Sequence, residues 1–235
     1  MAELKGYHDR TEAGRRLAQE LRSDLPSRED ALVLALPRGG VPVGYEVARE
    51  LELPLDVMVV RKLGLPSQPE LAMGAIASGG VRLLNETVLE MAHVSAEALE
   101  VVEQGERREL ERREKAYRGD RPVPGLAGRT VIVVDDGVAT GSTIRAAVRA
   151  VRTQRPRSVV VAVPVASPDS VKKLRTEADQ VVCPLVPKSL SAIGFWYRDF
   201  PQLTDDEVRR MLHRAWETED TRSGFDDGPD RRRGR

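Results

Sequence analysis

The fold is decided by the stretch Val131-Ile132-Val133-Val134-Asp135-Asp136-Gly137-Val138-Ala139-Thr140-Gly141-Ser142-Thr143. Its four β-branched apolar residues predict a buried strand, which ends in two carboxylates. A short loop with two glycines follows, and then hydroxyl residues at the start of a helix. Because the first amides of a helix have no intrahelical partner and lie at the positive end of its dipole, they favour a phosphate. The stretch therefore predicts a phosphate site beside an acidic pair.

The acidic pair needs a partner of its own, because carboxylates repel a phosphate. Ionised Asp135 and Asp136 only accept hydrogen bonds, so sugar hydroxyls are natural partners. Mg²⁺ or its water shell is the other natural partner. The two features together predict a site for a sugar phosphate.

This stretch resembles the motif with which type I phosphoribosyltransferases bind 5-phosphoribosyl-1-pyrophosphate (PRPP). That motif has an apolar strand, two acids, a few small residues, then Thr-Gly and a hydroxyl residue. The stretch lacks the Gly-Lys-Ser/Thr ending of a Walker loop and the GxGxxG pattern of a dinucleotide-binding loop. The resemblance implies PRPP and Mg²⁺, with Asp135 and Asp136 as catalytic residues that hold the ribose diol. No direct Mg²⁺ ligand is assigned, since the ion would arrive with PRPP and lie near these acids. By the same resemblance, the 5-phosphate is bound by Gly137, Val138, Ala139, Thr140, Gly141, Ser142 and Thr143.

Two weaker stretches occupy the positions that the family predicts. Leu36–Pro42 follows the apolar run Ala31–Leu36 and resembles the pyrophosphate loop, which implies that Arg38, Gly39 and Gly40 bind the diphosphate. A second apolar run, Asp56–Val60, leads into a polar segment over residues 61–70. In the family the loop at this place is often mobile, so Lys62 is implied as a catalytic residue that reaches the diphosphate. The alternative interpretation of Lys62 is a solvated surface cation.

Apolar strands and amphipathic helices alternate around these motifs. This alternation predicts an α/β fold with a twisted, mainly parallel sheet and helices on both faces. We expect strands at 31–36, 56–60, 130–134, 158–165 and 180–186, a hairpin over 72–85, and helices at 9–25, 43–53, 142–154, 168–177 and 204–216. One domain would cover residues 1–217, followed by a disordered tail over 218–235 whose three consecutive arginines (231–233) are best interpreted as solvated.

Two segments depart from the compact core. Residues 85–124 predict a helical insertion, and within it Ser95–Arg118 predicts a long helix with ion pairs at i,i+4. Its thin apolar stripe leaves three interpretations open: a solvated surface helix, a lid, or an arm of a homodimer. Residues 187–203 are the candidate hood, in which Phe195 and Trp196 would bind the acceptor. A hydrophobic plug is the alternative interpretation of this aromatic cluster.

Composition excludes several other classes of protein. The chain has 235 residues with 37 acidic and 37 basic side chains, and this balance argues against a nucleic-acid coat or a basic membrane binder. No apolar run approaches the length of a membrane span. Cys183 is the only cysteine, which is typical of a reducing compartment, so a cytoplasmic protein is expected.

The resemblance implies a glycosyltransferase of the pentosyltransferase kind, which moves 5-phosphoribose from PRPP to a nitrogen acceptor such as a nucleobase and releases diphosphate. A PRPP-sensing protein without catalysis is the main alternative, and a scaffold with a vestigial site is a third. Ala139 stands where enzymes of the family acting on 6-oxopurines commonly have an aspartate. Hypoxanthine and guanine are therefore expected to be poor substrates, while adenine, a pyrimidine or another nitrogen acceptor remains open.

Overall fold

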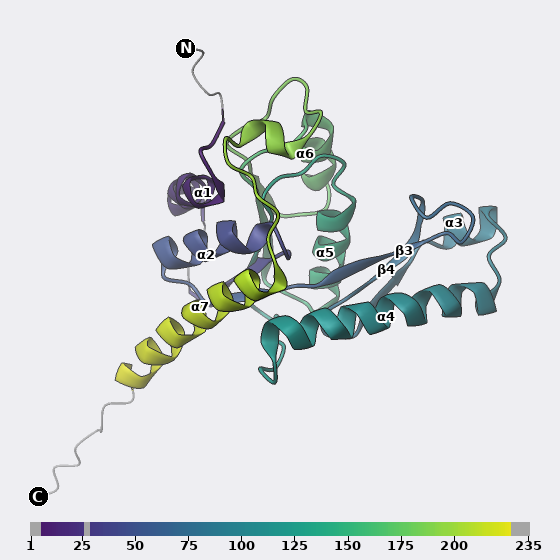
Figure 1. The fold of residues 1–235 in the computed structure, drawn as a ribbon, viewed down its shortest axis with the longest axis horizontal. Helices are drawn as coiled ribbons and strands as arrows, with labels where there is room; N and C mark the ends of the chain where they lie inside the picture. Colours follow the sequence, from purple (N-terminus) through teal and green to yellow (C-terminus); the bar gives the residue numbers. More distant parts are fainter. Residues whose placement is uncertain (1–5, 26–28, 227–235) are drawn as a thin grey trace, which may run out of the picture.

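The computed structural model describes residues 6–25 and 29–226 (Figure 1). Its helices are α1 (Arg10–Asp24), α2 (Gly40–Leu51), α3 (Glu86–Met91), α4 (Ala96–Arg118), α5 (Ser142–Thr153), α6 (Pro168–Leu174), the short 3₁₀ helix η1 (Ile193–Trp196) and α7 (Asp205–Asp226). Its strands are β1 (Ala31–Ala35), β2 (Leu55–Val57), β3 (Val60–Gly64), β4 (Ala72–Ala77), β5 (Val81–Leu84), β6 (Thr130–Val134), β7 (Ser158–Ala162) and β8 (Gln180–Val182).

The main sheet has five strands in the order β2-β1-β6-β7-β8, and every pairing in it is parallel. Its centre is the β1–β6 pair, in which Ala35 lies opposite Val134. This arrangement confirms the predicted α/β fold with a mainly parallel sheet. A second, antiparallel sheet has the order β3-β4-β5 and contains the predicted hairpin.

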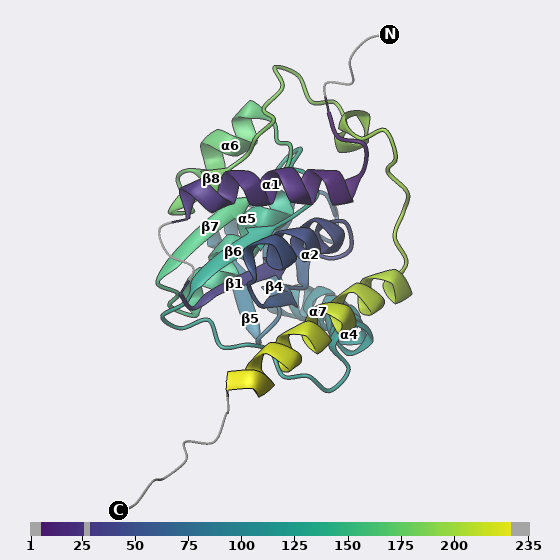
Figure 2. The same ribbon diagram turned by 90° about the vertical axis from the view of Figure 1, so that its left-hand side faces the viewer.

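Helices cover both faces of the parallel sheet, as the continuous apolar strands require. Alternate residues of β6 point to opposite faces, so Ile132 and Val134 pack with α1, α2 and α7, while Val131 and Val133 pack with α5 and α6. Figure 2 shows α1, α2 and α7 on the side of the sheet that faces the viewer. Packing on both faces thus fixes β1 and β6 side by side, with Ala35 opposite Val134 at their carboxyl ends.

The region after β2 differs from the prediction. The expected strand 56–60 is split: β2 ends at Val57, and Val60–Gly64 forms β3 of the antiparallel sheet. Leu63 is fully buried and pairs with Gly74 of β4, which stabilises a strand where polar content predicted a loop. Lys62 therefore lies on a strand, and the expected loop over 61–70 shortens to the turn between β3 and β4.

The long helix of the insertion is confirmed as α4, with Ser95 as its N-cap. It is less exposed than its thin apolar stripe predicted, because its C-terminal turn is anchored by a buried ion pair. The Arg118 guanidinium donates from Nε to Asp56 Oδ1 of β2 at 2.7 Å, and both side chains are almost fully buried. The Trp216 indole of α7 donates to the Leu55 carbonyl at 2.8 Å. The two helices thus cover the edge strand β2.

The i,i+4 spacing of α4 predicts four ion pairs, and three of them form: Glu103 with Arg107, Glu109 with Arg113 and Glu114 with Arg118. Lys115, expected to pair with Glu111, instead contacts Asp120 beyond the helix end. The chain turns at Gly119, whose positive φ favours glycine, and this turn brings Asp120 close to Lys115. The Lys115–Asp120 pair thus forms in place of the helical pair with Glu111.

The end of the chain also differs from the prediction. Helix α7 continues through Asp226, so the stretch expected as a disordered tail from residue 218 begins as helix. The remaining tail, with its three arginines, lies outside the described residues. Among the helices described, none is long and apolar enough to span a membrane.

Candidate functional site

Two loops meet at the carboxyl edge of the parallel sheet, because β1 and β6 are neighbours and end together. The Leu36 amide, just beyond β1, donates to the Val134 carbonyl at 2.8 Å. The Pro37–Arg38 peptide bond that follows is cis. A Cβ on Gly39 would overlap the Asp136 carboxylate, and one on Gly40 would lie 2.7 Å from the Val134 carbonyl oxygen. The first loop thus packs directly on the acids, at a distance that only glycine permits.

The helices that follow these two loops begin differently from the others. Side chains cap the first amides of five described helices: Asp9 for α1, Asn85 for α3, Ser95 for α4, Ser167 for α6 and Thr204 for α7. Glycine stands at the N-cap of α2 and of α5, and neither has a side-chain cap. In α2 the Gly40 and Val41 amides donate to the Leu36 and Arg38 carbonyls, and Pro42 has no amide hydrogen. Among the described residues, the α5 N-terminus has no such backbone acceptors for its first amides, so it is the one of the two that presents free donors to a ligand.

The second loop, from Gly137 to Gly141, is held from behind by the start of α6. The Ala139 carbonyl accepts hydrogen bonds from Ser167 Oγ at 2.8 Å and Ser170 Oγ at 2.7 Å. Gly141 has a φ of 80°, which brings the chain into α5 and favours glycine. The hydroxyl residues predicted to bind phosphate, Thr140, Ser142 and Thr143, are exposed around this turn. Backbone and hydroxyl donors thus surround one point at the start of α5.

The two acids differ in environment. Asp136 is buried, and its Oδ2 accepts a hydrogen bond from Arg10 Nε at 2.9 Å. Asp135 is partly exposed and accepts from the Asp136 amide at 2.9 Å. Burial and the Asp136 charge raise the pKa of Asp135 well above its usual range. Burial also raises the pKa of Asp136, but Arg10 opposes this shift. Asp136 is therefore paired with a cation of the protein, whereas Asp135 has a backbone amide as its partner.

Arg10 was not among the site residues predicted from the sequence. Its signal was an arginine in the first turn of a predicted helix, where the helix dipole favours acidic residues. A cation at that position needs an acidic partner elsewhere, and tertiary structure brings Asp136 to it from a position 126 residues away.

The candidate hood, residues 187–203, lies against the acids. The Tyr197 hydroxyl donates to the Asp136 carbonyl at 2.6 Å, and a Cβ on Gly137 would lie 2.7 Å from Ile193. Tyr197 is buried and stacks on Phe200 with ring centroids 4.8 Å apart. Phe195, by contrast, is 79% exposed. Tyr197 thus forms a buried plug, Phe195 is exposed and Trp196 is partly buried. Binding of the acceptor by Phe195 and Trp196 stays a prediction.

The two predicted cations lie in different parts of the molecule. Arg38 is exposed beside the glycines, and its guanidinium lies 4.0 Å from Asp205 at the start of α7. Lys62 lies on β3, where its ammonium is 3.2 Å from the Glu70 carbonyl and 3.4 Å from the Glu70 carboxylate. Among the described residues, the side-chain polar contacts are with Asp205 for Arg38 and with Glu70 for Lys62. The structure thus brings the glycines next to Arg38 onto the acids, but it shows no contact of either cation with Asp135 or Asp136.

The described residues contain no group of three or more His, Cys, Asp or Glu side chains that could hold a metal by themselves. The site does have one partly exposed carboxylate, Asp135, between the glycine loop before α2 and the uncapped N-terminus of α5. Mg²⁺ commonly binds through one or two carboxylates together with substrate phosphates and waters. The oxygen donors present therefore fit a Mg²⁺ ion that arrives with a phosphorylated ligand.

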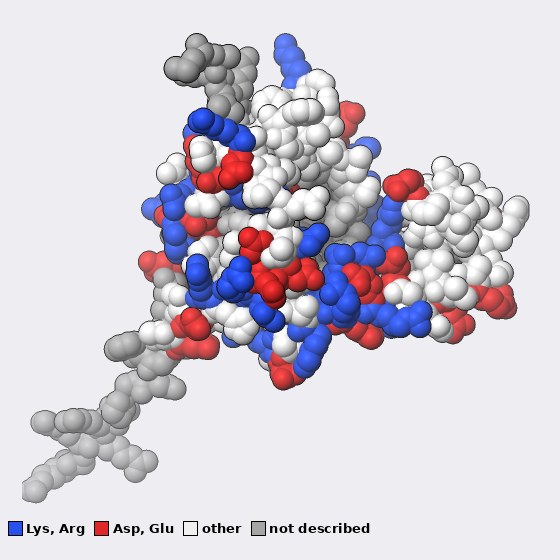
Figure 3. All heavy atoms as spheres, in the orientation of Figure 1, with Lys and Arg blue, Asp and Glu red and all other residues white. Residues whose placement is uncertain are grey.

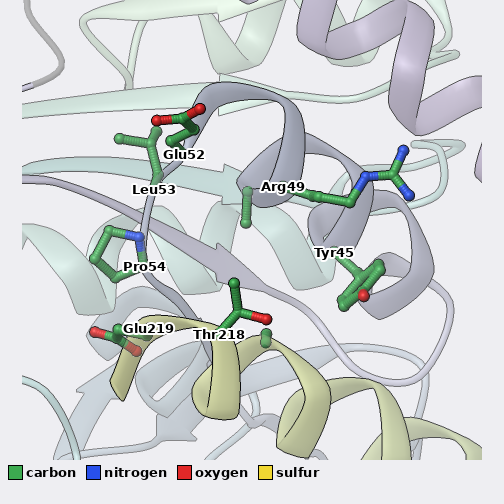
Figure 4. A pocket seen from close by; sticks show the side chains of 9 residues that line it. Tyr45, Arg49, Glu52, Leu53, Pro54, Thr218 and Glu219 are labelled. Carbon is green, nitrogen blue, oxygen red and sulfur yellow. The ribbon is translucent and has the colours of Figure 1, made fainter. Parts of the chain in front are cut away.

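A separate hollow lies between α2 and α7, lined by Tyr45, Ala48, Arg49, Glu52, Leu53, Pro54, Ala215, Thr218 and Glu219 (Figure 4). It is at the C-terminal end of α2, whereas Gly40 begins that helix at the site. A helix of this length spans about 18 Å, so the hollow is distinct from the loops at the sheet edge.

The fold and the site define a class of protein, an α/β domain in which adjacent strands carry an acidic pair and two uncapped helix N-termini. Comparison with known proteins agrees with this class. The phosphoribosyl transferase domain family matches residues 2–195. Two Mycobacterium tuberculosis proteins, from strains H37Rv and CDC 1551 and each named "putative phosphoribosyl transferase", are 48% identical over 212 residues. That match covers 90% of this chain and 47% of each relative, so the chain spans about half their length.

A solved structure resembles the whole fold. The crystal structure of TT1426 from Thermus thermophilus is 43% identical, with a TM-score of 0.80, and the match covers 88% of this chain and 97% of that one. The chain belongs to the phosphoribosyl transferase domain family.

Proposed function

We propose that the protein is a phosphoribosyltransferase that binds PRPP with Mg²⁺ and transfers 5-phosphoribose to a nitrogen acceptor. One observation carries this proposal: the uncapped N-terminus of α5 and the glycine loop of Arg38, Gly39 and Gly40 follow neighbouring strands, with Asp135 between them. PRPP carries phosphate groups at both ends of a ribose. A helix N-terminus on one side of a carboxylate and a glycine loop with an arginine on the other match that distribution of charge and hydroxyl groups.

Each part of the site has a role in this proposal. The 5-phosphate binds at the Gly137–Thr143 loop, and the diphosphate binds at Gly39 and Gly40 with Arg38 as its counter-charge. Asp135 accepts hydrogen bonds from the ribose diol. Mg²⁺, when bound, neutralises diphosphate charge near Asp135.

The reaction breaks the bond from the anomeric carbon to the diphosphate oxygen and forms a bond to the acceptor nitrogen. Its transition state is cationic at that carbon, so a nearby carboxylate stabilises it. The bonding pair leaves with the diphosphate, and the acceptor nitrogen loses a proton to solvent or to a basic group. The enzyme's contribution is therefore positioning and electrostatics.

Lys62 and the hood complete the proposal. Lys62 reaches the diphosphate only if the antiparallel sheet moves, because its ammonium lies beside Glu70 in this structure. Residues 187–203 are proposed as the hood, in which exposed Phe195 and partly buried Trp196 bind a flat acceptor by stacking.

The acceptor is proposed to be a base other than hypoxanthine or guanine. The Ala139 side chain cannot accept or donate a proton, and its carbonyl already receives two hydrogen bonds from Ser167 and Ser170. No group at this position can therefore handle the proton of a 6-oxopurine. Adenine, a pyrimidine and other nitrogen acceptors remain as candidates.

Isothermal titration with PRPP and Mg²⁺, followed by turnover assays over adenine, hypoxanthine, guanine and pyrimidines, tests the proposal. Binding with release of diphosphate in the presence of one acceptor supports it. Binding without turnover of any acceptor would identify a PRPP-sensing protein instead. Absence of binding would contradict both, and turnover of hypoxanthine or guanine on the order of 1 per second would contradict the Ala139 argument.

A further inference from the structure

A buried arginine connects three segments that are far apart in the chain. Arg10 is the first residue of α1, and only 9% of it is exposed. Its Nε donates to Asp136 Oδ2 at 2.9 Å, and its Nη1 donates to the Pro201 carbonyl at 2.8 Å. Its guanidinium carbon lies 3.7 Å from the centre of the Phe200 ring. One side chain thus joins α1, the acidic strand end of β6 and the segment that leads into α7.

These contacts are more than packing of the core requires. A buried charge is costly unless it is paired, and an apolar side chain in the same space would avoid that cost. The partner of Arg10 is an acid of the candidate site. Its second partner, Pro201, precedes Asp205, which lies 4.0 Å from Arg38. Arg10 therefore contacts Asp136 itself and the segment that leads to the only described carboxylate paired with Arg38.

We propose that Arg10 is a positioning residue for phosphoribosyl transfer: it holds Asp136 ionised and in one orientation and fixes the 197–201 segment over the site. This inference rests on the proposed function. Arg10 is assigned a positioning role because it is buried, with Nε on Asp136, Nη1 on the Pro201 carbonyl and the guanidinium face against Phe200.

The charge of Arg10 has a defined effect on pH dependence. The titratable and charged groups that face Asp136 are Arg10 from α1, Asp135 beside it and Tyr197 from the hood segment. Tyr197 is neutral in the working range, because burial raises its pKa further. Asp135 opposes ionisation of Asp136, so Arg10 is the one cation among these groups that favours it. Removal of Arg10 should raise the pKa of Asp136. As the pH is lowered, the variant should therefore begin to lose PRPP affinity at a higher pH than wild type does.

The experiment measures the PRPP dissociation constant with Mg²⁺ as a function of pH for wild type, Arg10→Gln and Arg10→Lys. Arg16→Gln is the matched control, since Arg16 lies on the same helix and pairs with Glu12 at an exposed position. Carbon-13 titration of the Asp136 carboxyl group, measured without PRPP, gives its pKa in each protein. Melting curves show whether each variant folds.

Arg10→Gln is expected to bind PRPP at least tenfold more weakly than wild type. The acidic limb of its pH profile, where PRPP affinity falls with decreasing pH, and the Asp136 pKa should both move to higher pH. Arg10→Lys should restore the limb but not the full affinity, because one ammonium cannot reproduce the fork that reaches both Asp136 and Pro201. An unshifted limb and Asp136 pKa in folded Arg10→Gln would overturn the proposal, even with a lower melting temperature. If Arg10→Gln does not fold, an Arg10→Lys protein that matches wild type in affinity at every pH would overturn it.

The two hypotheses fail in different ways. Wild type that does not bind PRPP overturns the proposed function, and this role of Arg10 with it. Wild type that binds PRPP while Arg10→Gln binds it equally at every pH overturns the inference alone.

Discussion

The carboxyl edge of the parallel sheet and the arm formed by β3–β5, α3 and α4 are built in opposite ways. At the sheet edge, glycines bring backbone against carboxylates, and the N-terminus of α5 has no side-chain cap. In the arm, side-chain ion pairs such as Arg61 with Glu106 and Arg82 with Glu103 join strand to helix. α3 has no buried residue, and Met91 at its end is 77% exposed. Figure 3 shows few charged side chains at the far end of the arm, compared with the charged surface over α7 and the C-terminal half of α4.

This contrast teaches where substitutions should matter. Where glycine backbone packs directly on the acids, there is no room for a side chain, so even an added methyl group would displace a carboxylate or carbonyl of the site. An arm joined by exposed ion pairs loses little when one pair is removed, because each pair contributes less than about 1 kcal/mol. Matched substitutions in the two regions should therefore have very different effects.

The largest difference is expected between two Gly→Ala substitutions. Gly39→Ala should weaken PRPP binding at least about a hundredfold, roughly 2.7 kcal/mol, because its Cβ would overlap the Asp136 carboxylate. Gly105→Ala in α4 has open space around it and should stabilise the helix by about 0.5–1 kcal/mol with unchanged affinity. Titration calorimetry and denaturant unfolding measure both effects. Equal PRPP affinities for the two variants would contradict the expected difference between the sheet edge and the arm.

The next difference lies within the acidic pair. Asp136→Asn should destabilise the fold by about 2 kcal/mol, since it weakens a buried charge-assisted hydrogen bond from Arg10. Asp135→Asn should do the opposite at neutral pH, because it removes a carboxylate whose pKa is raised by burial and by Asp136. Its amide oxygen can still accept from the Asp136 amide. A gain of roughly 2–4 °C in melting temperature corresponds to about 1 kcal/mol for a chain of this size.

The sign of the Asp135 effect depends on pH. An unfolded aspartate titrates near its usual pKa of about 3.9, and the folded one titrates higher. Between these values the folded state binds more protons, so the free energy of unfolding falls as the pH rises through this window. The advantage of Asp135→Asn over wild type should therefore vanish below about pH 4. A constant difference at all pH values would contradict the burial argument.

A third prediction concerns the turn between β3 and β4. Residues 65–71 should gain amide protection when PRPP and Mg²⁺ bind if Lys62 acts in a lid, whereas the β3 amides paired with β4 are protected already. Hydrogen exchange with mass spectrometry separates the two segments. Equal protection of residues 65–71 with and without ligand would leave Lys62 as a surface cation paired with Glu70.

The smallest effect is expected on the exposed face of α4. Arg107→Gln removes one of the two ion pairs of Glu103 and should cost about 0.3–0.5 kcal/mol without any change in PRPP affinity. Urea unfolding and calorimetry are sufficient to measure this. A loss of affinity in this variant would show that the arm is coupled to the site, and the contrast between the two regions would fail.

The core and the glycine loops were predictable because their signals are local. Apolar runs identified β1 and β6 to within a residue at their ends, and the order of acids, glycines and hydroxyls placed α5 correctly. β3 was missed because burial of Leu63 comes from a partner strand, and that pairing leaves no periodic pattern in a short polar segment. α7 was predicted too short, since polar residues after Trp216 resemble a tail when no packing partner is known.

The sequence by itself determined the α/β class, the loop between β6 and α5 and the position of the two acids at the end of β6, because strand burial, glycine geometry and helix starts depend on neighbours along the chain. Only the tertiary structure decided which acid is paired with a cation. Asp135 and Asp136 are adjacent and identical in type, yet Arg10, 126 residues from Asp136, pairs with Asp136, while Asp135 accepts a backbone amide. Electrostatic and packing contacts between distant segments carry no sequence period, so they become visible only once the chain has folded.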